Sequence, residues 1–174
     1  MTLTIDALLD RDHAVLRQLA QEMRSCARPA AARALFKQFT AALGGHLTAG
    51  RKVVRPVLAS AGWSDPRCDL LLGETHFTHT FAELLTLKLD TAAFTEALSD
   101  VLEATDQLVK REQDELLPLL REHLDEAQLL SLALEAERYL VHPGMEEHSL
   151  RLHASDWLEE ARLLLGGLQA TPTP

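Results

Sequence analysis

The chain has few cysteines and no long apolar run, and each of these features argues against certain classes of protein. Its two cysteines, Cys26 and Cys68, lie far apart and lack the spacing of a zinc or redox motif. We therefore expect two reduced thiols in a cytoplasmic protein rather than a disulfide scaffold. No apolar stretch approaches the roughly 20 residues that a transmembrane helix needs, and residues 1–6 do not resemble a signal peptide.

Basic charge is also in short supply. Lysine and arginine number 17 against 26 aspartates and glutamates, which gives a net charge of −9 with neutral histidines. A surface of this sign repels phosphates, so neither nucleic acid nor an anionic membrane is an expected partner. The sequence also lacks a glycine-rich phosphate loop and a nucleophile elbow. A binding or sensing module is therefore favoured over an enzyme.

Leucine and alanine dominate the apolar residues, and this composition favours helices over strands. Apolar side chains recur at helical spacing, and sustained alternation of the strand type is lacking. The expected helices cover residues 4–25, 31–60, 66–89, 92–118, 124–140 and 145–165. We predict an all-α, four-helix up-down bundle with two additional C-terminal helices. Pro118 should kink or end the fourth helix, because proline breaks the helical hydrogen-bond ladder.

The domain organisation follows from these helices. We expect one domain over residues 1–168, with a core bundle over about 4–123 and C-terminal helices over about 124–166. Residues 169–174 form an expected disordered tail. The C-terminal helices are rich in leucine, so they should either cap the bundle or pair with a second copy as a homodimer.

An internal repeat carries the chemistry. His46 and Gly50 are four residues apart and are followed by Pro56, and Leu108 and Glu112 are likewise followed by Pro118. Together the copies describe His-x-x-x-Glu with a proline six residues after the acid. A histidine and a carboxylate four apart on a helix share a face and can bind one metal ion. The first copy has lost the acid and the second has lost the histidine.

Three polar residues occupy core positions of amphipathic helices: His13, His46 and Glu112. A single buried histidine is ordinary, but three converging polar groups would each cost a few kcal/mol if unpaired. We predict that these three and His76 meet inside the bundle as metal ligands. His79 should point toward solvent.

These residues resemble the hemerythrin-like (HHE cation-binding) domains. The resemblance is carried by Leu8-Leu9-x-x-x-His13, by the two copies of the repeat with their prolines, and by His76, over about residues 4–123. It implies a bundle that holds a non-haem di-iron centre for binding or sensing iron, O2, NO or redox state. Among the family's ligand positions, His13, His46, His76 and Glu112 match, whereas Gly50 and Leu108 replace a carboxylate and a histidine.

These two substitutions change the expected site. One acid is too little negative charge for two Fe(II) ions, so at most one iron is expected, unless Glu74, His79 or Glu83 replaces a lost ligand. Two alternatives stay open. One is a metal-free interaction or regulatory module. The other is a bundle that binds haem or a small ligand in the space beside Gly50 and Leu108.

Overall fold

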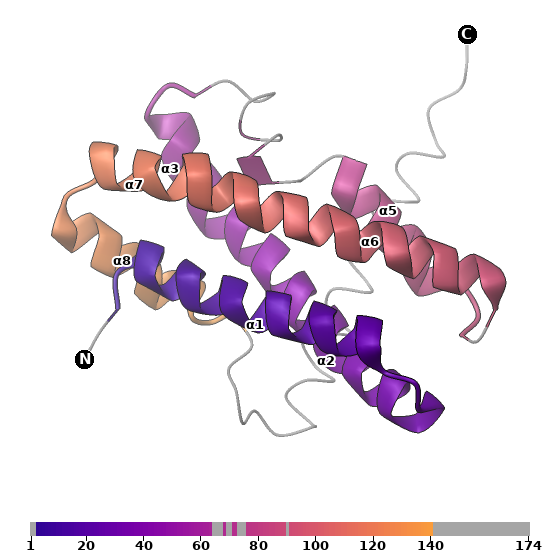
Figure 1. The fold of residues 1–174 in the computed structure, drawn as a ribbon. Helices are drawn as coiled ribbons and strands as arrows, with labels where there is room; N and C mark the ends of the chain where they lie inside the picture. Colours follow the sequence, from indigo (N-terminus) through magenta and orange to yellow (C-terminus); the bar gives the residue numbers. More distant parts are fainter. Residues whose placement is uncertain (1–2, 64–67, 69–70, 73–75, 90, 141–174) are drawn as a thin grey trace, which may run out of the picture.

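The computed structural model describes residues 3–63, 68, 71–72, 76–89 and 91–140, and His76 by its backbone alone. This part of the chain is all-helical, as predicted (Figure 1). Its elements are α1 (Ile5–Ser25), α2 (Pro29–Ala49), η1 (Gly50–Val54), α3 (Arg55–Ser60), α5 (His76–Thr86), α6 (Ala92–Arg111), η2 (Glu112–Leu116), α7 (Leu117–His123) and α8 (Glu126–Ala136). The expected helix at 145–165 and the expected tail at 169–174 lie outside the described residues.

The sequence repeat has a structural counterpart in two π-helical turns, η1 and η2. The N–H of Arg55 donates to the carbonyl of Gly50, and the N–H of Leu117 donates to the carbonyl of Glu112. Each bond reaches five residues back, and each widened turn comes just before the proline of its copy. Proline lacks an N–H and crowds the preceding turn, and the wider π turn accommodates it. The helix therefore continues past Pro118 to His123 and does not end at the proline.

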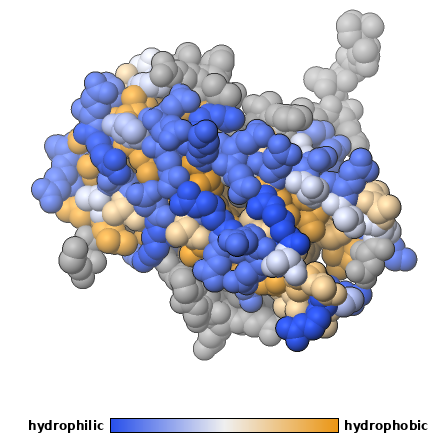
Figure 2. Space-filling view, viewed as in Figure 1, coloured by the Kyte–Doolittle hydropathy of each residue, from blue (hydrophilic) through white to orange (hydrophobic). Residues whose placement is uncertain are grey.

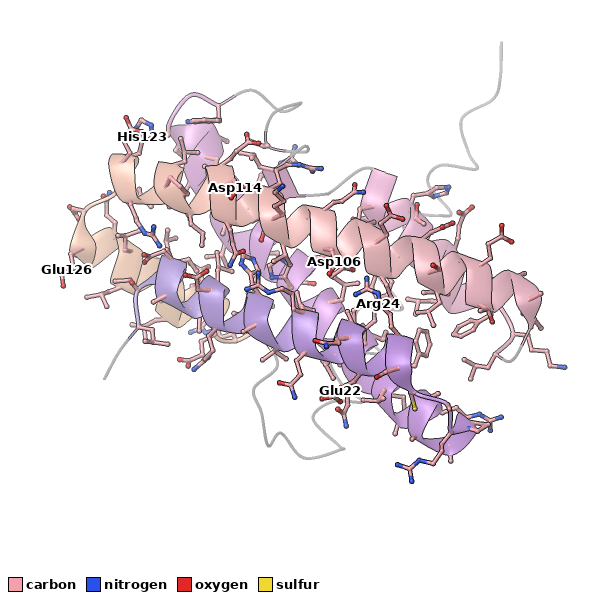
Figure 3. All side chains as sticks on the ribbon, viewed as in Figure 1. Glu22, Arg24, Asp106, Asp114, His123 and Glu126 are labelled. Atoms are coloured by element: carbon pink, nitrogen blue, oxygen red, sulfur yellow. The ribbon has the colours of Figure 1, made fainter. Side chains whose placement is uncertain are left out.

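Helix α1 runs antiparallel to the long helix formed by α6, η2 and α7 (Figure 1). Near the start of α1, Asp6 Oδ2 accepts a hydrogen bond from Arg121 Nε of α7 at 2.7 Å. Near its end, Arg24 Nη2 donates to Asp106 Oδ2 of α6 at 2.7 Å, and Figure 3 shows these two side chains facing each other. Exposed pairs of this kind contribute less than about 1 kcal/mol each, so they report the alignment of the helices more than they stabilise it.

Two apolar clusters fill the core, one toward each end of α1. The first joins α1, α2, α5 and α6 around Phe39 and Phe81. The second joins the start of α1 to η1, α3, α7 and α8 around Ile5 and Leu71. Charged and polar side chains cover most of the face seen in Figure 2, with apolar side chains showing between them. Among the described residues, no helix has the length and apolar character needed to cross a membrane.

Helix α8 packs on the rest of the molecule, as expected for a C-terminal helix that covers the bundle. It begins with a capping box in which Asp125 and Gln128 each bond the other's backbone N–H. Its buried side chains lie in the second cluster with those of α1 and η1. Beyond its end, the carbonyl oxygen of Tyr139 lies 2.2 Å from where a Cβ on Gly45 would stand. Only glycine permits this approach of the chain to α2.

Candidate metal centre

Three side chains from three helical segments meet at one buried point between the two apolar clusters. His13 Nε2 of α1 lies 2.6 Å from Glu112 Oε2, and His46 Nε2 of α2 lies 3.0 Å from the same oxygen. One ligand atom from each residue lies within 4.8 Å of the other two. Their exposed fractions are 0%, 2% and 2% for His13, His46 and Glu112. The predicted convergence of these three residues is thus present in the structure.

A fourth polar residue, Asp12, lies behind His46. Its Oδ2 accepts a hydrogen bond from His46 Nδ1 at 2.8 Å, and its side chain is buried. The ring of His46 is therefore held at both nitrogens, Nδ1 by Asp12 and Nε2 by Glu112. Asp12 was not among the site residues predicted from the sequence. The signal was its spacing of four residues from both Leu8 and Leu16, which places it on the buried side of α1.

The charges of the cluster stabilise one another. Burial alone would lower the pKa of His46, but the Glu112 carboxylate and the hydrogen bond to Asp12 outweigh it and raise the pKa to about 10. Burial alone would likewise raise the pKa of Glu112, but the charge on His46 and the hydrogen bond from His13 lower it to about 2. At neutral pH, without a metal ion, Glu112 is ionised and His46 is an imidazolium.

These charges also assign the proton on His13. An ionised carboxylate only accepts hydrogen bonds, so His13 carries a proton on Nε2, where it meets Glu112. Among the described residues, neither His13 Nδ1 nor Asp12 Oδ1 has a hydrogen-bond partner, although both atoms are buried. The cluster therefore holds two unsatisfied polar atoms that burial makes costly.

The two π turns lie beside this cluster. His46 is one turn before Gly50, where η1 begins, and Glu112 is the first residue of η2. Widened turns of this type occur frequently at functional sites, since they change the direction of side chains without ending the helix. The prolines of the repeat thus help to define the backbone from which the histidine and the acid project.

The spacing of the donor atoms suits a metal ion. Ligands held about 2.1 Å from a metal at right angles lie about 3 Å apart, close to the 2.6 Å and 3.0 Å found here. Two histidines and one carboxylate on one side of an ion form the facial triad of non-haem iron proteins. In the metal-free cluster, the same donor atoms are occupied by hydrogen bonds to one another.

The other predicted site residues have different surroundings. Leu108 is 2% exposed and packs in the first apolar cluster. A Cβ added to Gly50 would lie 3.4 Å from Leu72 Cδ2, so a leucine occupies space beside this glycine. His79 is partly exposed, with Nε2 3.3 Å from Glu83 Oε1 on the same helix. His76 begins α5, but its side chain and all of Glu74 lie outside the described residues.

Comparison of the chain with models of protein families, with curated proteins and with solved structures finds no match in any of the three.

Proposed function

We propose that this protein binds one divalent transition-metal ion through His13, His46 and Glu112, and that Fe(II) is the first candidate for this ion. The observation that carries this proposal is the convergence of three metal-type donor atoms from three helical segments on one buried point. The proposed role is that of a hemerythrin-like module that binds or senses iron, O2, NO or redox state.

The donor set favours one ion over two. Among the described residues, the metal-type group has three members, and Glu112 is its only acid. The positions that would complete a second ligand pair hold Gly50 and Leu108, which offer no donor side chain. Two Fe(II) ions would bring four positive charges into a buried site, and burial makes such an excess costly. A single ion with three protein ligands keeps open positions for a small ligand.

Iron, when bound, would supply a redox-active centre and coordination positions for a small molecule. The chain's own residues would supply the rest. The Nε2 atoms of both histidines and Glu112 Oε2 hold the ion, and Asp12 holds the ring of His46. The apolar clusters on either side limit the access of bulk water.

The direction of the helices supports the up-down bundle within this proposal. Helix α1 is antiparallel to α6 and α7, α2 follows α1 after a connection of three residues, and α5 contacts α6. These relations are those of a chain that runs up and down four times around one core. A site in the bundle core, built from facing helices, is the usual place for a metal in such a fold.

A metal-free interaction or regulatory module is the second candidate. One observation favours it: His46 and Glu112 satisfy each other's charge without an ion. In that case the cluster only specifies how the helices pack. The two candidates differ in one measurable property, the affinity of the purified protein for metal.

The test is an anaerobic titration of the metal-free protein with Fe(II), with the ion counted by elemental analysis. Zn(II) and Co(II) serve as further probes, because the visible absorption of Co(II) reports its ligands. We expect one ion per chain. His13→Phe should abolish binding, and His79→Phe, at a partly exposed histidine, should leave it unchanged. No binding of any of the three ions would exclude the metal proposal, and an intense Soret band in the purified protein would instead indicate haem.

A further inference from the structure

We infer that Asp12 is a positioning residue of the metal site, which selects the ligand nitrogen of His46 and supplies the second negative charge that a divalent ion requires. The inference rests on the proposed function. It assigns a role to a residue that contributes no atom to the group of three ligands.

The geometry of His46 carries the first step. Asp12 Oδ2 lies 2.8 Å from His46 Nδ1, whereas His46 Nε2 faces Glu112 Oε2 at 3.0 Å. A carboxylate can only accept, so Nδ1 must keep its proton to make this bond. Nε2 is then the nitrogen with a lone pair to offer once its own proton leaves. The pair Asp12–His46 thus has the form of a carboxylate that orients a metal-binding histidine through its second nitrogen.

The charge of the site carries the second step. Glu112 alone would leave one positive charge uncompensated beside a bound divalent ion. Asp12, at 3% exposed, brings a second carboxylate to the same buried region. Two carboxylates and two neutral histidines balance a charge of +2, and balanced charge is what makes an ion tolerable in a site of low polarity.

In the metal-free cluster, the charge of Asp12 is paired with the protonated ring of His46, whose Nδ1 lies 2.8 Å from Asp12 Oδ2. An asparagine in place of Asp12 could accept the same hydrogen bond from His46 Nδ1 at nearly the same size. The second carboxylate oxygen of Asp12, Oδ1, is buried and has no hydrogen-bond partner among the described residues. If a metal ion replaced the Nε2 proton of His46, the ring would become neutral, and the charge of Asp12 would remain to balance the ion.

The test compares the Zn(II) and Co(II) affinities of the full-length protein, Asp12→Asn and Asp10→Asn by competition with a chelator. Asp10→Asn is the matched control: it removes the same charge from the exposed side of α1, where Asp10 accepts a bond from Gln113. We expect Asp12→Asn to weaken binding by roughly 10- to 100-fold. The control should change it by less than about fivefold, because exposed charges interact weakly. Equal affinities for the two variants would overturn the inference.

A second readout needs no variant. In the Zn(II)-loaded parent, nitrogen NMR of the imidazole should show His46 bound through Nε2 and protonated at Nδ1. Binding through Nδ1 would overturn the inference even if Asp12→Asn failed to fold. If the parent bound no metal at all, the proposed function would fail with it. If the parent and Asp12→Asn bound one ion with the same affinity, the inference about Asp12 would fail and the proposed metal site would stand.

Discussion

Replacing Glu112 with glutamine should strongly destabilise the metal-free protein. Glu112 is buried, and its Oε2 lies 2.6 Å from His13 Nε2 and 3.0 Å from His46 Nε2. Glutamine has the same shape but carries no charge, so His46 would lose the larger of the two carboxylate contributions that keep it protonated. The His46 ring would then be buried beside a neutral amide, which cannot balance the charge of an imidazolium.

Two arguments give the magnitude. A fall in the pKa of Glu112 from 4.5 to about 2 stabilises the ionised form in the folded state by about 3 kcal/mol, at about 1.4 kcal/mol per pKa unit. Breaking a buried ion pair by removing one partner costs about 3–5 kcal/mol in general. We therefore expect Glu112→Gln to lower the free energy of unfolding at pH 7 by about 3 kcal/mol.

The assay is urea unfolding in the presence of a chelator, followed by circular dichroism. Glu115→Gln is the control, because Glu115 lies on the same π turn but is exposed. It should change the free energy of unfolding by no more than about 0.5 kcal/mol. If Glu112→Gln unfolds at the same urea concentration as Glu115→Gln, with an unchanged slope, the buried charge pair described here does not exist in solution.

Three further predictions concern the pH dependence of stability, the substitution of two glycines and the restoration of the His-x-x-x-Glu repeat. Without metal, the stabilisation from Glu112 should be lost as the pH falls from 4.5 toward 2, and the stabilisation from His46 should be lost as the pH rises from 6.5 through 10. The urea concentration at the midpoint of unfolding, measured across this pH range, reports both losses. A midpoint that does not change with pH would contradict the charge pair. Gly45→Ala should destabilise the protein by about 1–3 kcal/mol or more, because the new Cβ would collide with the backbone carbonyl of Tyr139. Gly50→Ala should instead stabilise the protein by up to about 1 kcal/mol, because alanine has the higher helix propensity. Thermal unfolding compares the two, and equal effects would refute the close approach. Gly50→Glu with Leu108→His should raise iron uptake above one ion per chain, because it restores both His-x-x-x-Glu copies and a Cβ at position 50 makes only ordinary contact with Leu72. Elemental analysis measures the uptake, and an unchanged value would contradict the prediction.

The convergence of the three side chains of the candidate site was predictable because helical periodicity determines which residues share a face. His13, His46 and Glu112 each stand where an apolar residue is expected, and a polar residue at such a position either finds partners in the core or destabilises it. The sequence could therefore indicate that they converge. It could not give the distances, because these depend on how far each helix is rotated and shifted against its neighbours.

Asp12 and the π turns were harder to predict for a physical reason. Residues 12 and 13 are about 100° apart around α1, so both are buried only if α1 has neighbours on two sides. Helix α1 does contact both α2 and α6, which buries Asp12 beside His46 and His13 beside Glu112. Which helices flank α1 is a tertiary property. The prolines indicated a disturbance of the helix, but a kink, an end and a widened turn are all compatible with proline in a sequence.

The split repeat divides the candidate ligands between different helical segments. Here the histidine of the first copy and the acid of the second meet across α2 and η2. A metal ion at this point would join these segments to each other and to α1. The binding free energy would then stabilise the tertiary structure directly, by about 2.7 kcal/mol at a metal concentration 100 times the Kd.

The surroundings of Gly50 and Leu108 also favour a site for a single ion. Leu108 packs in the apolar cluster that joins α1, α2, α5 and α6, and Leu72 lies against Gly50. Apolar side chains thus lie at the two positions of the repeat that carry no metal-type donor, and by excluding water they strengthen the charged contacts of the cluster. Within our proposal, one donor from each copy of the repeat together with His13 gives a donor set suited to one ion, and Leu108 and Leu72 occupy space at the other two positions of the repeat.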